Sequence, residues 1–184
     1  MFGFEPAMMS AMQTIISQWL YSLKHYVLMC LLLSSPERLP YSPYPLLLTG
    51  FAYFSIGLFL VDAQRSYALV CAQILLELTM LGLLSYVALR WKKSMTRLLQ
   101  TFSALLGINF VITAATIPAY RMVAANGSAE SNLLVYATLL ILVWNLAVLS
   151  LIFKRSFEIS TQLSAMLSFA YFFVYQIIVF WMYP

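Results

Sequence analysis

The stretch 67–97, YALVCAQILLELTMLGLLSYVALRWKKSMTR, decides the fold. Residues 67–89 form an apolar run that is long enough to cross a bilayer, because about 20 helical residues span a hydrocarbon core of roughly 30 Å. The run ends in a basic cluster: Arg90, Lys92, Lys93 and Arg97. Such a cluster predicts a cytoplasmic loop. Glu77 places one carboxylate near the middle of the run, and an ionisable group at that depth is a candidate functional residue.

The composition is that of a polytopic membrane protein. The chain has 184 residues, of which 63% are hydrophobic and 9% are charged, whereas soluble domains average about 25% charged residues. The net charge of +4 does not indicate nucleic-acid binding, because most of the Lys and Arg residues fall on one predicted side of the membrane. The two cysteines and the single histidine lack the spacing of a metal site or a disulfide framework.

Residues 1–33 are expected to form an amphipathic helix that lies in the membrane interface. Apolar residues recur every three or four positions between residues 8 and 30, and polar residues occupy much of the other face. The alternative is a first transmembrane helix, which would have to bury Lys24 and His25. Residues 34–45 contain four prolines and predict a cytoplasmic linker, because proline removes backbone donors and disfavours continuous helix.

Residues 46–184 are expected to form a transmembrane bundle of five helices. The predicted spans are 45–61, 67–89, 98–120, 132–153 and 161–182. Eight of the ten basic residues fall in segments assigned to the inner side, and only Arg65 and Arg121 fall in the outer loops. This bias predicts a cytoplasmic amino terminus and a carboxyl terminus on the outside. We expect the membrane to be a bacterial inner membrane.

Four predicted spans each place a polar side chain at a similar depth. These side chains are Glu77, Asn109, Asn145 and Gln176, with Gln73 one turn before Glu77. In one interpretation they are hydrogen-bonding contacts between helices, worth roughly 0.6 kcal/mol per bond. In the other, Glu77 is a proton or cation site lined by the amides. The helix rotations that would bring these groups together are not specified by the sequence pattern.

The chain lacks the sequence signatures of enzymes. It contains no HExxH, no GxSxG, no glycine-rich phosphate-binding loop and no acidic cluster for a metal. We therefore expect no catalytic residue, no metal site and no cofactor. The bilayer itself is the first expected partner, and another integral membrane protein or a second copy of the chain is the next.

Two short patterns carry a resemblance to a known family. A Ser-Pro stretch, Ser34-Ser35-Pro36-Glu37, precedes the first predicted span. Residues 97–107 follow the pattern Arg-x-x-Gln-Thr-x-x-Ala-Leu-x-Gly, which looks like one that a bacterial membrane family would carry. With its layout of five closely spaced helices, the chain resembles the YIP family of small membrane proteins. The resemblance implies a role in membrane trafficking or membrane organisation in eukaryotes and a poorly defined role in bacteria, and it supplies no catalytic residue.

These observations favour a small non-enzymatic membrane protein that acts as an accessory or scaffold subunit of a larger membrane complex or in membrane organisation. One alternative is a small oligomeric element of a proton- or cation-coupled transporter, centred on Glu77. Another is a lipid-handling protein whose amino-terminal helix senses or deforms one leaflet.

Overall fold

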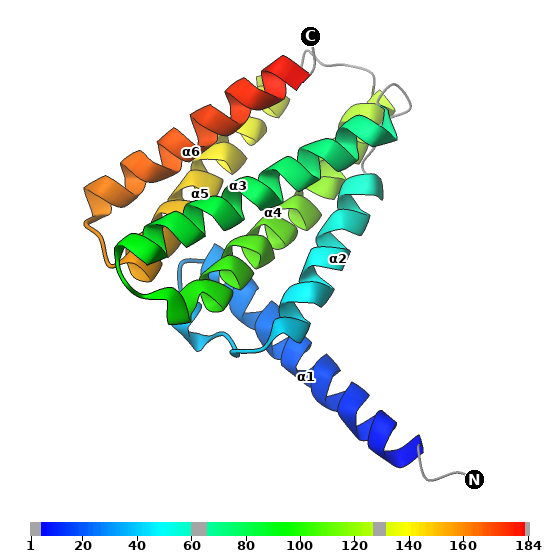
Figure 1. Ribbon diagram of the computed structural model, residues 1–184. Coiled ribbons are helices and arrows are strands. Elements are labelled where there is room, and N and C mark those ends of the chain that lie inside the picture. Colours follow the sequence, from blue (N-terminus) through cyan, green and yellow to red (C-terminus); the bar gives the residue numbers. More distant parts are fainter. Residues whose placement is uncertain (1–4, 60–65, 127–131, 183–184) are drawn as a thin grey trace.

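The computed structural model describes residues 5–59, 66–126 and 132–182, which form helices joined by short connections, with no strand among them (Figure 1). In chain order the elements are α1 (Glu5–Cys30), the 3-10 helix η1 (Pro36–Arg38), α2 (Pro43–Phe59), α3 (Tyr67–Trp91), the 3-10 helix η2 (Met95–Arg97), α4 (Leu98–Asn126), α5 (Asn132–Phe157) and α6 (Thr161–Met182). The all-α prediction is confirmed.

Four segments are long and apolar enough to cross a membrane. They are Tyr67–Trp91, Met95–Pro118, Val135–Phe157 and Thr161–Met182. By length and composition these are the helices of an integral membrane protein. The apolar helix α2 has 17 residues, or about 25 Å at 1.5 Å per residue, which is shorter than a typical bilayer core. The count of five spans therefore stays a prediction, and the last two residues of the first predicted span, 60–61, lie outside the described residues.

Several element boundaries differ from the predicted ones. Helix α3 continues to Trp91, past the predicted residue 89, and α5 continues to Phe157, past the predicted residue 153, so Lys154 and Arg155 lie in a helix and not in the predicted inner loop. Helix α2 begins at Pro43, inside the predicted linker, because the first-turn backbone N–H groups of a helix have no intrahelical partner and proline costs little there. Helix α4 continues to Asn126, past the predicted end of its span at residue 120. Part of the predicted outer loop 121–131 is therefore helical, and residues 127–131 lie outside the described part of the chain.

Helix α4 is the centre of the bundle. It contacts α1, α2, α3 and α5, and residues 103–109 form an unbroken buried run. Small residues in that run, Ala104 and Gly107, let neighbouring helices approach closely. Glu77 and the basic cluster lie on α3 or directly after it, but the tertiary contacts place α4 at the core. More of α3 than of α4 lies at the outer surface.

Helix α1 extends away from the bundle at its amino-terminal end and joins the core at its carboxyl-terminal end (Figure 1). Tyr26 and Met29 are fully buried, and the Tyr26 hydroxyl lies 2.7 Å from Ser103 Oγ of α4. The indole Nε1 of Trp144 in α5 donates to the backbone oxygen of Cys30 at 2.8 Å. The second half of α1 is therefore part of the core, whereas the predicted interfacial position of residues 1–33 stays a prediction.

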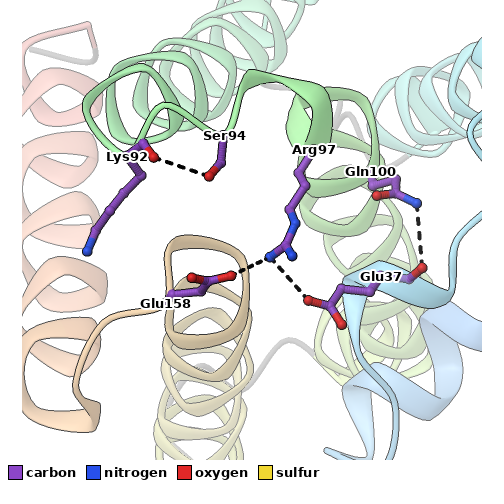
Figure 2. Close-up of polar contacts among 6 residues, drawn as sticks. All are labelled: Glu37, Lys92, Ser94, Arg97, Gln100 and Glu158. Atoms are coloured by element: carbon purple, nitrogen blue, oxygen red, sulfur yellow. Dashed lines mark hydrogen bonds and ion pairs between the residues drawn. The ribbon is translucent and has the colours of Figure 1, made fainter.

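An ion-pair network ties three connections together at one end of the bundle (Figure 2). Arg97 Nη1 lies 2.7 Å from Glu158 Oε1, after α5, and 3.2 Å from Glu37 Oε1, in η1. Gln100 Nε2 donates to the backbone oxygen of Leu39 at 2.9 Å. These contacts place the linker, the α3–α4 connection and the α5–α6 connection on the same side of the bundle, as the charge bias requires of inner loops.

Candidate functional site

The Glu77 carboxylate lies at the meeting point of α2, α3 and α4. The Tyr53 hydroxyl of α2 donates to Glu77 Oε2 at 2.5 Å. The Asn109 Nδ2 of α4 donates to Glu77 Oε1 at 3.0 Å. Each carboxylate oxygen thus has a donor from a different helix, and the two bonds hold three helices in one relative rotation.

A glycine allows α2 to come close enough to α3 for the first of these bonds. A Cβ atom at Gly57 would lie 2.5 Å from the Cδ1 of Ile74, a distance that real Cβ contacts do not show. Gly57 stands one turn after Tyr53 on α2, and Ile74 stands one turn before Glu77 on α3. The missing side chain therefore permits the approach that brings the phenol to the carboxylate.

A second polar contact connects α3 to α6. Gln73 Nε2 donates to the Tyr175 hydroxyl at 3.1 Å, and the Tyr175 ring stacks on Tyr171 with 6.4 Å between centroids. The Tyr171 hydroxyl is buried and has no hydrogen-bond partner among the described residues. Together these groups extend the polar layer from α2 across the bundle to α6.

Two of the predicted cluster residues do not join this layer. Gln176 is exposed on the outer face of α6, because successive helical residues are rotated by about 100° and Tyr175 occupies the inward position. Asn145 of α5 is partly buried, and no hydrogen bond joins it to Glu77 within the described residues. The structure thus brings Glu77 together with Asn109, sets Gln73 on Tyr175, and leaves the other two amides apart.

Sequence reasoning missed the three tyrosines of the layer, Tyr53, Tyr171 and Tyr175. A signal for two of them exists in the spacing of α6, where the residues that turn inward recur every three or four positions. They are Ser164, Ser168, Tyr171 and Tyr175. Hydroxyl-bearing residues on one face of an otherwise apolar helix indicate the face that packs inside a bundle. Tyr53 has no comparable pattern around it, since α2 carries aromatic residues on several faces.

The chemistry available to this layer is limited to hydrogen bonding and the exchange of a proton. Both donors to Glu77 are neutral groups, so dipoles stabilise the carboxylate, and no cation pairs with it among the described residues. Within the described ranges no three His, Cys, Asp or Glu side chains come together in a way that could hold a metal ion. The layer can fix the helices or hold a proton on the carboxyl group.

The predicted basic loop divides into two parts. Arg90, Lys92 and Lys93 are exposed at the end of α3. In Figure 2 the Lys92 side chain extends away from the ion-pair network, and the Lys92 backbone oxygen accepts a hydrogen bond from the Ser94 hydroxyl. Arg97 is bound between Glu37 and Glu158. Within the described ranges the side chains of the first three cations make no ion pair, whereas Arg97 has a structural role.

A comparison with protein-family models, curated proteins and solved structures found no match to this chain.

Proposed function

We propose that this chain is a non-enzymatic integral membrane protein that serves as an accessory or scaffold subunit and works through helix contacts with another integral membrane protein. We place it in a bacterial inner membrane with a cytoplasmic amino terminus, an outer carboxyl terminus and five spans, α2 being the first. The resemblance to the YIP family, with its implied role in membrane organisation, is compatible with this proposal.

The main support for this proposal is the difference between the two faces of α6. The inward face bears the serines and tyrosines already described. The outward stripe, again at spacings of three and four residues, consists of Met166, Phe169, Phe173, Gln176 and Phe180. Phe180 is 78% exposed and Phe173 is 60% exposed. A stripe with this spacing is the pattern by which one helix packs along another.

Gln176 is the observation that favours a protein partner over lipid on this stripe. Its side chain is exposed and makes no hydrogen bond among the described residues. It lies about 9 Å from the end of α6 at 1.5 Å per residue, inside the predicted span. An amide costs about 4–8 kcal/mol in a medium that cannot hydrogen-bond. A partner helix with a polar group at the same depth would remove that cost.

The outer surface of α1 supports the interfacial position that the proposal assigns to it. Met12, Ile16 and Leu20 are exposed on one side of the helix. The exposed residues on the neighbouring side, Gln13, Ser17 and Lys24, are polar. A helix that separates its exposed residues in this way suits the boundary between hydrocarbon and water.

Site-specific photocrosslinking in native membranes tests the proposal. The photoreactive analogue benzoylphenylalanine replaces Phe173 or Phe180, and the matched control carries it at Leu140 on the exposed face of α5. We expect a protein adduct of one defined mass at both α6 positions, a lower yield after Gln176→Leu, and no such adduct at position 140. Lipid adducts alone at all three positions, or an adduct of twice the chain mass, would overturn the role as a subunit for another protein.

The second candidate is a proton- or cation-coupled element centred on Glu77. The buried Tyr171 hydroxyl favours it, because a phenol without a hydrogen-bond partner among the described residues offers the polar layer a further position for a proton. Proton flux into liposomes that contain the purified protein tests it. This candidate expects Glu77→Gln to abolish the flux while the protein stays folded, and a flux equal to that of the original protein would refute it.

A further inference from the structure

A polar cavity of about 400 Å³ lies where the linker after α1 meets the end of α5. Its lining residues are Leu33, Ser34, Ser35, Glu37, Arg38 and Arg155. The volume falls within the range of roughly 300–1,000 Å³ that is usual for small-molecule sites. The cavity is at the same end of the bundle as the Arg97 ion pairs, and none of its lining residues belongs to the Glu77 layer.

The lining gives this cavity a positive character. Glu37 is the single carboxylate in the lining, against two arginines, and it pairs with Arg97, 3.2 Å away and outside the cavity, which it shares with Glu158. Arg38 is exposed and has no ion pair or hydrogen bond from its side chain within the described residues. The guanidinium group of Arg155 donates to the backbone oxygen of Ser34, which fixes it in the wall. Two guanidinium groups therefore face one cavity without a carboxylate of their own.

The Ser35 hydroxyl adds hydrogen-bond capacity beside the arginines. Ser35 lies directly before η1, and its hydroxyl makes no capping bond to that helix. The Ser34 hydroxyl lies 2.9 Å from His25 Nδ1, and this hydrogen bond fixes Ser34 in the cavity wall. Arginine forks and serine hydroxyls are the groups that proteins use to bind phosphate oxygens.

The rim of the cavity is apolar on the side of α1. Leu31, Leu32 and Leu33 are exposed in succession, and Leu33, which is 69% exposed, also lines the cavity. A free phosphate would not contact these leucines. A ligand with an anionic head and an apolar tail would contact both the arginines and the leucines. Basic cavities next to membrane-spanning helices are suited to anionic lipid headgroups.

We propose that this cavity binds the phosphate group of an anionic phospholipid, with Arg38 and Arg155 on the phosphate oxygens and an acyl chain along Leu33. The proposal does not depend on the partner role of α6, because it uses different residues at a different depth. The bound lipid would contact the linker between α1 and α2 and would thereby connect α1 and this linker to α5.

Native mass spectrometry of the delipidated protein tests the proposal, with dioleoylphosphatidylglycerol as the probe and dioleoylphosphatidylcholine as the zwitterionic comparison. We expect one phosphatidylglycerol molecule to bind, with an affinity reduced about tenfold or more by Arg38→Gln, because a charge-assisted hydrogen bond is lost. Lys92→Gln is the matched control, since it removes an exposed cation outside the cavity. Equal binding by the original protein, Arg38→Gln and Arg155→Gln would overturn the site.

A second arm separates a lipid from a soluble phosphate compound. Glycerol 3-phosphate carries the head chemistry without acyl chains, and Leu33→Ser removes the apolar rim without touching a cation. We expect Leu33→Ser to weaken phosphatidylglycerol binding and to leave glycerol 3-phosphate binding unchanged. If glycerol 3-phosphate binds as tightly as the lipid and Leu33→Ser changes neither, the assignment to a lipid is wrong and the ligand is a soluble phosphate.

Discussion

Gly107 of α4 lies directly against the ring of Tyr26 of α1. A Cβ atom at Gly107 would overlap three atoms of that ring. Tyr26 is fully buried, and its hydroxyl reaches Ser103 one turn earlier on α4. The absence of a side chain at one position therefore determines where α1 enters the bundle.

Gly107→Ala should displace α1 from its groove. The ring of Tyr26 cannot move aside easily, because its hydroxyl is bound and the residue is buried, so we expect a loss of about 1–3 kcal/mol of stability from overpacking. Gly50→Ala is the control, since a Cβ there would lie 3.5 Å from Leu106, an ordinary contact. Thermal unfolding in detergent measures the stability, and proteolysis after Lys24 reports the release of α1. Equal midpoints for both variants would contradict the packing argument.

Tyr53→Phe should weaken the contact between α2 and α3. The change removes the donor to Glu77 Oε2 and keeps the ring, so we expect a loss of roughly 0.6–1.7 kcal/mol, between the average and the maximum found for hydrogen bonds inside a membrane bundle. Tyr44→Phe, at an exposed position of the same helix, should leave the stability unchanged. Adding Glu77→Leu to Tyr53→Phe should cost less than the sum of the two single changes, because they share one bond. Additive losses of stability would show that Tyr53 and Glu77 do not interact.

Arg97→Gln should have a small effect that depends on salt. Arg97 and its partners Glu37 and Glu158 are partly or largely exposed, and ion pairs of this kind contribute about 1 kcal/mol or less. We expect the difference in unfolding midpoint between Arg97→Gln and the original protein to shrink as salt rises from about 0.05 M to 1 M. Lys92→Gln, which removes a neighbouring exposed cation, should show neither effect. A large loss that salt does not change would mean that Arg97 acts through packing.

His25 should make the stability depend on pH below neutrality. Burial, with smaller contributions from the Arg38 and Lys24 charges, lowers the pKa of His25 from its ordinary value of 6.5. As the pH falls through 6.5, the unfolded chain takes up the proton before the folded chain does. The free energy of unfolding therefore falls with falling pH until the folded-state pKa is passed.

The variant His25→Asn isolates this contribution. Asparagine keeps a polar atom within reach of the Ser34 hydroxyl but does not titrate, so the pH dependence between about 7 and 5 should flatten. Unfolding midpoints measured across that interval give the comparison, and any slope from carboxylates is common to both proteins. If the variant shows the same pH dependence of stability, His25 is not its source.

The extent to which the site could be predicted from sequence is clear from Glu77 and Gln176. Both are polar residues within predicted spans, and the sequence pattern treats them alike. In the structure Glu77 binds two helices, while Gln176 is exposed on the outer face of α6. Depth along a helix can be counted from the sequence, but rotation about its axis depends on which neighbour it packs against, and a rotation of about 100° per residue separates the two outcomes.

The sequence by itself determined that this is a helical membrane protein with its basic connections gathered at one end, because apolar length and the distribution of charge are properties of local segments. Only the tertiary structure decided that α4 is the central helix, that Tyr53 is the partner of Glu77, and that the linker after α1 forms a cavity with Arg155. Each of these depends on contacts between residues far apart in the chain. Such contacts are set by close packing at a few small residues, such as Gly57 and Gly107, whose role is invisible until the neighbouring helix is known.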